Sequence, residues 1–313
     1  MPESVSCRGE PTVLRPLGFE GSRVRIAVFG ATGVVGGALL PRLAPEHELV
    51  AISRSARPLN AGIRWLEGDV GSGEDVEQAV AGADVVYYLV HSLGSRDFER
   101  EDRVAAQNVA AASERAGVRQ IVYLGGLGDD SSVASRHLRS RRETGERLAS
   151  GSTPVTTLRA AMIVGKGSAA FETIVALVDR LPAMIMPSWV STPTQPIALD
   201  DIARYLAAVC GEESTFGESF DAGGPEVMTY RQMIERIAAL RDRRPWIVEV
   251  PVLTPRLSSL WLHLVTPVGA SIARPLIEGL KNPTIAREER LRRLLPFELT
   301  TFDQAARSAF ASS

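Results

Sequence analysis

Lysine is nearly absent from this sequence, since only Lys166 and Lys281 stand among its 35 lysine and arginine residues. A catalytic lysine therefore has only two possible positions. Cysteine is equally scarce, and Cys7 and Cys210 lie far apart and form no metal-ligand spacing. This scarcity indicates a reduced, cytoplasmic protein, and we expect no metal site.

The sequence also lacks an excess of either charge, because its formal net charge at pH 7 is −2. A nucleic-acid partner requires a basic surface, so none is expected. Residues 257–277 carry few charges over a membrane-spanning length, but proline, glycine, histidine and arginine interrupt them. We therefore expect a buried or amphipathic segment there and no stable membrane span. Residues 1–22 are polar and have no apolar signal-peptide core, which predicts a loose N-terminal tail.

Apolar residues are plentiful, at 45% of 313 positions, which is enough for a sizeable core. The most informative stretch is residues 24–40, where an apolar run leads into a glycine-rich turn and then into a helix-compatible run. Gly30 lets the chain leave a strand sharply, Gly33 lets a pyrophosphate approach the backbone, and Gly36 lets the helix pack close to the strand. The start of that helix offers free N–H groups to phosphates. The predicted cofactor contacts in this turn are Gly30, Thr32, Gly33, Val34, Val35 and Gly36.

Strand and helix signals alternate through the first half of the chain. We predict further strands at residues 49–52, 63–70 with the following loop, 83–90, 120–124 and 155–160. This order predicts an α/β fold with a Rossmann-type doubly wound parallel sheet over residues 23–165. A smaller, mostly helical substrate lobe is expected over residues 166–313, in which Trp246 and Phe297 are candidates for the core or for a pocket lining.

The residues after the second strand bear on the choice of cofactor. An acidic residue about 20 positions after the glycines holds a ribose 2′-hydroxyl, whereas an arginine suits a 2′-phosphate. Here Ser53 and Arg54 end the strand, and no acidic residue lies between positions 51 and 62. We therefore predict NADP(H) over NAD(H). The alternative is that Arg54 is simply a solvated charge at a strand end.

Polar residues follow the fourth strand, at the edge where ligands bind in a doubly wound sheet. Leu89, Val90, His91 and Ser92 are therefore expected near the ribose and nicotinamide side of the cofactor. His91 is one of only four histidines. It is either a pocket residue that takes part in proton transfer or a polar loop residue.

The glycine-rich turn in this context resembles that of the short-chain dehydrogenase/reductase (SDR) superfamily. Its Gly-Ala-Thr-Gly form is similar to the extended and atypical branches, which include the NmrA-like proteins. The resemblance implies an NAD(P)-binding oxidoreductase in which Asp69 and Val70 contact the adenine. Asp69 could equally cap the following helix. The resemblance also implies that Asn108 supports the active site.

Members of this superfamily place Tyr-x-x-x-Lys on the helix after the fifth strand, because positions i and i+4 share a helical face and the lysine charge favours the phenolate. Here His137 takes the tyrosine position and Arg141 the lysine position, with Ser140 matching a serine of the extended motif. Histidine can act as a general acid, and arginine can hold a ribose or phosphate or stabilise an oxyanion. The predicted catalytic residues are therefore His137, Arg141 and His91.

The second half of the chain is less informative. Residues 195–203 resemble a family stretch, which implies that residues 195–225 return to the Rossmann domain and that Asp200 and Asp201 cap a helix. A set of apolar lobe residues suggests an apolar substrate, for example a polycyclic or polyketide-like one. These residues are Met162, Phe171, Met184, Met186 and Trp189.

The leading prediction is an NADPH-dependent oxidoreductase that reduces a C=O or activated C=C bond of a small, mainly apolar molecule. One alternative is a cyclase, isomerase or dehydratase without net redox chemistry, with His137 or His91 as the acid or base. The other is an NADP-sensing regulator that binds a protein partner, as some NmrA-like proteins do. We expect a monomer or a homodimer.

Overall fold

The computed structural model describes residues 23–57, 62–92, 95, 97–128, 135–250 and 282–311. The expected tail at residues 1–22 and the apolar segment at residues 257–277 lie outside this part of the chain. No helix in the described part is both long and apolar enough to cross a bilayer.

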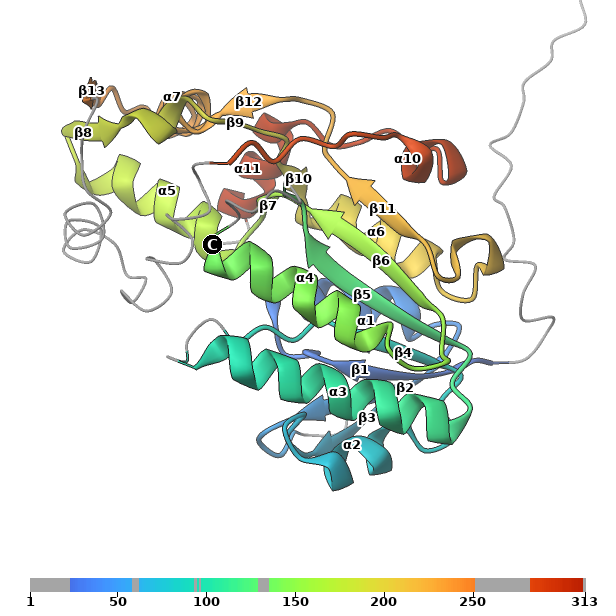
Figure 1. Cartoon of the computed structure of the whole chain (residues 1–313). Helices are drawn as coiled ribbons and strands as arrows, with labels where there is room; N and C mark the ends of the chain where they lie inside the picture. The colour runs from blue at the N-terminus through green and yellow to red at the C-terminus, as the bar shows by residue number, and fades with distance from the viewer. Residues whose placement is uncertain are drawn as a thin grey trace, which may run out of the picture.

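A seven-stranded parallel sheet forms the centre of the molecule (Figure 1). Its strands, in spatial order, are β3 (Ile63–Glu67), β2 (Glu48–Ser53), β1 (Arg25–Phe29), β4 (Val85–Tyr88), β5 (Gln120–Gly126), β6 (Val155–Ala160) and β11 (Ser219–Ala222). This order confirms the predicted Rossmann-type doubly wound sheet. The direction of winding reverses between β1 and β4, so the carboxyl ends of these two strands mark the ligand-binding edge.

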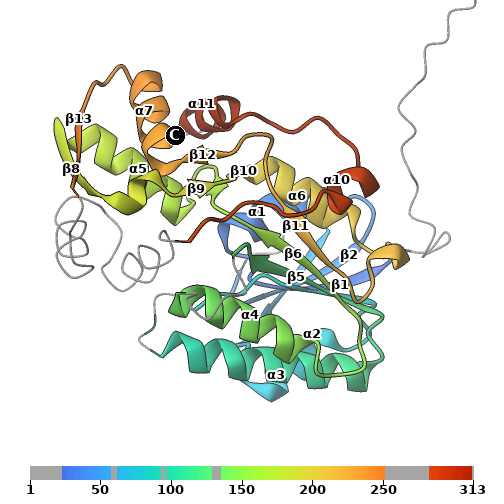
Figure 2. The same ribbon diagram turned by 45° about the horizontal axis from the view of Figure 1, so that its top comes forward.

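Helices cover both faces of the sheet (Figure 2). One face carries α1 (Val34–Leu43) and α6 (Leu199–Ala208), and the other carries α2 (Gly73–Val80), α3 (Phe98–Ala116) and α4 (Arg136–Leu148). The strands alternate to match, because successive side chains point to opposite faces. In β4, Val85 and Tyr87 pack in the core under α1 and α6, whereas Val86 and Tyr88 pack under α2 and α3.

The edge strand β11 comes from the second half of the chain and pairs with β6. The buried amide of Gln120 ties the same region to the sheet. Its Nε2 donates to Oγ1 of Thr156 at 2.8 Å and to the carbonyl of Val209 at 2.9 Å, and its Oε1 accepts from the N–H of Gly211 at 2.8 Å. Thr156 in turn donates to the carbonyl of Thr215 at 2.8 Å. Residues 209–215 thus satisfy buried polar groups of β5 and β6.

Most of the remaining elements form a lobe beyond the carboxyl ends of β5 and β6 (Figure 1). Its helices are α5 (Ala169–Arg180), α7 (Tyr230–Leu240), α11 (Phe302–Ala311) and the 3₁₀ turn η1 (Ser188–Ser191). The helix α10 (Arg290–Leu294) and the 3₁₀ turn η2 (Glu213–Thr215) lie outside the lobe, because Arg290 contacts the start of β11 and Thr215 contacts the starts of β5 and β6. The short strands of the lobe pair as β7 (Ile163–Val164) with β10 (Ile197–Ala198), β9 (Pro193–Thr194) with β12 (Met228–Thr229), and β8 (Ala183–Pro187) with β13 (Trp246–Val250).

The core of the lobe contains most of the residues from which an apolar substrate was predicted. Phe171, Met184 and Met186 are buried, and Met162 and Trp189 pack against the same cluster. Their apolar character is therefore explained by packing between α5, α7 and α11, and it no longer indicates a substrate. Of the two other aromatic candidates, Trp246 differs from expectation because it is 78% exposed. Phe297 agrees with expectation, because it packs against the main core beside Tyr205 with 4.5 Å between ring centres.

Asp200 and Asp201 do not cap α6, so this prediction is wrong. The N-cap is Ala198, and no side chain caps the helix. Asp200 pairs with Arg42 of α1. Asp201 is buried and accepts from the N–H of Thr300 at 2.7 Å and from its Oγ1 at 3.1 Å. The two carboxylates therefore join α6 to α1 and to the segment before α11.

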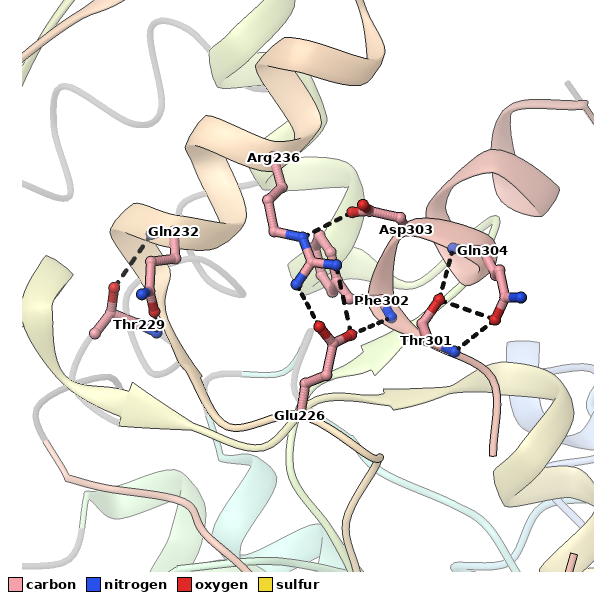
Figure 3. A network of polar contacts seen from close by, with 8 residues as sticks. All are labelled: Glu226, Thr229, Gln232, Arg236, Thr301, Phe302, Asp303 and Gln304. Atoms are coloured by element: carbon pink, nitrogen blue, oxygen red, sulfur yellow. Dashed lines mark hydrogen bonds and ion pairs between the residues drawn. The ribbon is translucent and has the colours of Figure 1, made fainter. Parts of the chain in front are cut away.

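A polar network holds α11 against α7 (Figure 3). The Arg236 guanidinium donates from Nη1 to Oε1 of Glu226 at 2.7 Å and from Nε to Oδ1 of Asp303 at 2.8 Å. Glu226 also accepts from the N–H of Phe302 at 2.9 Å, and the guanidinium carbon lies 5.3 Å from the centre of the Phe302 ring. Because Phe302 is buried in the lobe core, this network fixes the start of α11.

Candidate functional site

The glycine-rich turn lies directly against the end of β4. Gly30 has a φ of +83°, and a Cβ at this position would lie 2.7 Å from the carbonyl carbon of Leu89. A Cβ at Gly36 would lie 2.4 Å from the carbonyl oxygen of Gly30. Both positions therefore require glycine, one for its backbone conformation and the other for the close approach of α1 to the turn. These are the backbone roles that the sequence predicts for them.

The first turn of α1 fits an anionic group such as a pyrophosphate. Gly33 is the N-cap, no side chain caps the helix, and its first turn carries no acidic residue. Thr32 and Gly33 are exposed, and Val34 and Val35 are half-buried. A Cβ at Gly33 would approach nothing within 4 Å except the carbonyl oxygen of Gly30, at 3.2 Å. The uncapped N–H groups and the positive end of the helix dipole thus remain available to phosphates.

The adenine side of the predicted site lies beyond β2 and β3. Ser53 is buried at the end of β2, and the following Arg54 is exposed. The positions of Ser53 and Arg54 are compatible with a 2′-phosphate, and their contact with it stays a prediction.

The contacts of the loop after β3 bear on the predicted roles of Asp69 and Asn108. Oδ1 of Asp69 accepts from the N–H of Gly71 at 2.7 Å, and α2 is capped by the side chain of Ser72. The interpretation of Asp69 as a helix cap is therefore wrong, while its contact with adenine, together with that of Val70, stays a prediction. Asn108 donates to the carbonyls of Val70 at 3.2 Å and Gly71 at 3.0 Å. Asn108 thus supports this loop, contrary to its predicted place at the active site.

Beyond β4, three titratable side chains form one hydrogen-bonded row. Oδ2 of Asp102 lies 2.8 Å from Nδ1 of His91, and Nε2 of His91 lies 2.9 Å from Nδ1 of His137. The two imidazole centres are 4.8 Å apart. Asp102 belongs to α3 and His137 to α4, so these two helices bring the row together at the end of β4. We call these three residues the proton row.

Asp102 is held as a buried anion. Only 1% of its side chain is exposed. Its Oδ1 accepts from the N–H of Ser92 at 2.9 Å, and its Oδ2 also accepts from Oγ of Ser140 at 3.3 Å. Burial raises the pKa of Asp102, but the hydrogen bond with His91, the N–H of Ser92 and the charge of Arg141 outweigh it, so the pKa is lowered.

Sequence reasoning missed Asp102, although the sequence carries a signal for it. Residues three, four and seven positions later are the buried Ala105, Ala106 and Val109. Asp102 therefore stands on the apolar face of a helix, where a carboxylate needs a partner. Such a position marks an acidic residue for attention before the partner is known.

Arg141 is placed differently from its predicted role. It is 7% exposed, and its guanidinium donates from Nη1 to the carbonyl of Val90 at 2.9 Å and from Nη2 to the carbonyl of Leu124. Its guanidinium carbon lies 4.8 Å from the centre of the Tyr123 ring. Arg141 thus joins the ends of β4 and β5. The prediction that it holds a ribose, phosphate or oxyanion conflicts with this engagement of both Nη groups, although its charge stays beside the proton row.

Both histidines of the row are neutral at rest. Burial lowers the pKa of His137 to about 3, and the charges of His91 and Arg141 act in the same direction. Burial also lowers the pKa of His91, against the opposing hydrogen bond to Asp102. A lowered pKa favours the neutral form of His137 near neutral pH, and its role as a general acid stays a prediction.

The segment after β4 carries the other predicted cofactor contacts. Leu89, Val90, His91 and Ser92 are half-buried and follow the strand at the edge where the winding reverses. The N–H of Leu89 donates to the carbonyl of Phe29 at 2.9 Å, which continues the pairing of β4 with β1 as far as the glycine-rich turn. The proton row therefore begins immediately beyond the turn that would hold the dinucleotide.

A cavity of about 280 Å³ lies between α4 and the strands β5, β6 and β11. Its lining includes Tyr123, Arg139, Arg142 and Arg159, but neither His91 nor His137. This cavity is therefore not where the proton row would meet a substrate.

One family model matches the part of the chain that contains this site. Residues 30–161 match the family model described as NAD(P)H-binding. The matched region contains the glycine-rich turn, the end of β4, Asp102 and His137. With the Rossmann sheet, this match shows that the matched region is of an NAD(P)H-binding type, in agreement with the sequence prediction, and the resemblance to the atypical SDR group is consistent with it. NAD(P)(H) is accordingly its cofactor class.

The chain is similar to several known proteins. It is 24% identical over 245 residues to alpha subcomplex subunit 9 of the mitochondrial NADH dehydrogenase from Arabidopsis thaliana. This alignment covers 74% of this chain and only 61% of that subunit. It is 24% identical over 222 residues to the (4-alkanoyl-5-oxo-2,5-dihydrofuran-3-yl)methyl phosphate reductase of Streptomyces griseus, covering 70% of this chain and 74% of the reductase. An NADPH-dependent quinone oxidoreductase from Escherichia coli, solved with NADPH, has the same fold, with a TM-score of 0.72, 21% identity and coverage of 91% of this chain and 99% of that one.

Proposed function

We propose that the protein is an NADP(H)-dependent oxidoreductase that acts on a carbonyl or alcohol group, or on an activated C=C bond, of a small organic molecule. The observation that carries this proposal is the 2.9 Å hydrogen bond between His91 and His137 beside the nucleotide edge of the sheet. Hydride transfer to or from such a group must be accompanied by transfer of a proton, and His137 occupies the helical position of the family tyrosine. His137 is therefore the proposed catalytic residue.

The proposed preference for the 2′-phosphorylated cofactor rests on Arg54. Its exposed side chain follows β2, where a guanidinium can bind a phosphate and a carboxylate would repel it. The reductase activity of the Streptomyces relative and the NADPH bound by the Escherichia coli oxidoreductase agree with this proposal.

The cofactor proposal is tested by calorimetric titration with NADPH and NADH. The Arg54→Ala variant should bind NADPH at least about tenfold more weakly, which is about 1.4 kcal/mol, and bind NADH as the wild type does. Arg115→Ala is the matched control, because Arg115 pairs with Glu77 and lies in the last turn of α3, at the end of the helix away from Asp102. Equal binding of both nucleotides by the wild type would refute the preference for NADP(H).

The activity is tested by incubating the protein with NADPH or NADP⁺ and panels of ketones, enones and secondary alcohols. Formation of product with stoichiometric conversion of the cofactor supports an oxidoreductase. Conversion of a substrate without conversion of the cofactor would instead support the cyclase, isomerase or dehydratase alternative. Cofactor binding without any turnover would support the sensor alternative. In that case the His137→Phe variant should still bind the same protein partner as the wild type.

A further inference from the structure

The hydrogen bonds of the proton row fix where its protons lie. A carboxylate only accepts hydrogen bonds, so the 2.8 Å contact between Asp102 and Nδ1 of His91 places a hydrogen on that nitrogen. A neutral imidazole carries a single N–H, so Nε2 of His91 must accept. The 2.9 Å contact with His137 then places the hydrogen of His137 on its Nδ1. Nε2 of His137 is consequently unprotonated.

The unprotonated nitrogen is the end of the row. The bond to His91 is the only side-chain hydrogen bond of His137 within the described ranges of the chain. His137 is half-buried as a residue, and its Nε2 is not one of the fully buried side-chain atoms that lack a hydrogen-bond partner. A lone pair presented in this way can take a proton and, once Nδ1 passes its own proton to His91, the positive charge comes to lie beside Asp102.

On the basis of the oxidoreductase function proposed above, we propose that Asp102 is a positioning residue that fixes the tautomers of His91 and His137, so that Nε2 of His137 removes the hydroxyl proton of an alcohol substrate. The site is accordingly set for dehydrogenation of an alcohol, the reverse of the reduction that the sequence predicts.

The proposed step balances in protons and electrons. The O–H bond of the alcohol breaks, and its proton forms a bond to Nε2 of His137. The hydride leaves the carbinol carbon for the oxidised nicotinamide dinucleotide, which is thereby reduced, and the C=O bond forms. His137 passes its Nδ1 proton to Nε2 of His91, which becomes an imidazolium paired with the Asp102 carboxylate.

The groups that face the row explain why the resting state is neutral. Among the residues that the structure describes, the charged and titratable side chains around the row are Arg141 on α4, Tyr88 on β4 and Tyr123 on β5, with Asp102 of the row itself on α3. Burial and the charge of Arg141 oppose a positive charge on His137, and they outweigh the favourable charge of Asp102. Protonated His137, the donor that reduction requires, is therefore scarce at pH 7, whereas the neutral acceptor is abundant.

The contacts of Asp102 make the Asp102→Asn variant a directed test. The N–H of Ser92 donates to one carboxylate oxygen, so the oxygen of the new amide stays on that side and its NH₂ group faces His91. Nδ1 of His91 must then accept, and its Nε2 must donate to Nδ1 of His137. The hydrogen of His137 moves to Nε2, so the variant reverses both tautomers without removing a side chain.

The first measurement is the imidazole ¹⁵N NMR spectrum of the wild-type protein without cofactor at pH 7. The chain has only four histidines, so His91 and His137 can be assigned by substitution of each. We expect the hydrogen of both rings on Nδ1, and in Asp102→Asn we expect it on Nε2. Asp179→Asn is the charge-matched control, because Asp179 pairs with Arg241 in the lobe and should leave the spectrum unchanged.

The result that overturns the proposal is a wild-type His137 with its hydrogen on Nε2, or tautomers that are the same in Asp102→Asn as in the control. The wild-type spectrum decides the matter even if Asp102→Asn does not fold. In turnover assays, Asp102→Asn should lower kcat for alcohol oxidation by about 10²- to 10⁴-fold with an unchanged KM for the cofactor, by analogy with replacement of a tautomer-fixing aspartate. Failure to find any substrate would count against the proposed function, and the spectrum would still test the tautomers.

Discussion

His91 and His137 share a hydrogen bond of 2.9 Å although one residue follows β4 and the other lies in the first turn of α4. The hydrogen bond between His91 and Asp102 connects this pair to α3. A sheet edge and two helices must therefore be in place before the row exists, and its integrity reports on the packing of all three elements.

Replacing His137 by glutamine should lower kcat by about 10²- to 10⁴-fold, the usual contribution of a positioned acid or base, because glutamine cannot carry a proton between substrate and His91. Binding of NADPH should stay unchanged, as measured by calorimetry, since the phosphate-binding turn is intact. His47→Gln, in the loop between α1 and β2, is the control that should retain full activity. An active His137→Gln enzyme would exclude His137 from proton transfer.

Alanine at Gly30 should destabilise the protein by more than about 2 kcal/mol, because a Cβ would be strained at φ +83° and would meet the backbone of Leu89 at 2.7 Å. Gly37→Ala is the matched variant, since a Cβ there meets nothing within 4 Å. Inside α1 this change should stabilise the protein by about 0.4–1 kcal/mol. Urea denaturation measures both, and an equal effect of the two changes would contradict the packing of the turn.

The network of Figure 3 should make stability depend on pH through Glu226. Burial opposes the charge of Glu226, but hydrogen bonds from Arg236 and Phe302 outweigh burial and lower its pKa in the folded protein. A lowered pKa stabilises the fold above the ordinary glutamate pKa, and this stabilisation is lost as the pH falls through the folded value.

Glu226→Gln should therefore lower the free energy of unfolding by about 0.5–1.5 kcal/mol at pH 7, with a difference that shrinks on acidification. The control is Glu235→Gln, in which an exposed helical pair with Arg231 is lost and the cost should be only about 0.3–0.5 kcal/mol. Denaturation curves over a pH series measure both variants. A constant difference across that series would show that the charge of Glu226 is not responsible.

Truncation of Met184 should destabilise the protein more than truncation of Trp246, although tryptophan is the larger side chain. Trp246 is 78% exposed on β13, so Trp246→Ser should change stability by less than about 0.5 kcal/mol. Met184 is fully buried, so Met184→Ala should cost about 2–5 kcal/mol. Thermal or urea denaturation decides this, and a large loss in Trp246→Ser would mean that the exposed ring is covered in solution.

The order of strands and helices could be predicted because hydrophobic runs and helical periodicity are local signals. The sixth strand has the predicted bounds, and the helix at residues 230–240 begins where Thr229 and Gln232 form a capping box. Capping by Asp200 and Asp201 was implied by the resemblance of residues 195–203 to a family stretch, and it is wrong. The partner that determines the place of Asp201 is Thr300, 99 residues further along the chain.

Only those parts of the site that depend on the spacing of residues along one element could be predicted from the sequence. The i, i+4 relation placed His137 and Arg141 on one helix, but the direction of the Arg141 side chain depends on the carbonyls of Val90, just after β4, and of Leu124 in β5. Asp102 stands 35 positions before His137, and no local pattern relates their side chains. Their joint role follows from the packing of α3 against α4, which only the folded structure supplies.

The hydrogen bonds of Gln120 determine the shortest fragment of this chain that can be transferred to another protein with its buried polar groups still paired. A gene fragment that ends at residue 161 would keep Gln120 and Thr156 but lose the backbone of residues 209–215 to which they bind. Each buried polar group left without a partner costs about 1–3 kcal/mol, and β6 would become a bare edge open to aggregation. A chimaera that exchanges the nucleotide-binding half must therefore cross over beyond β11, at a point well past the last crossover helix of the sheet.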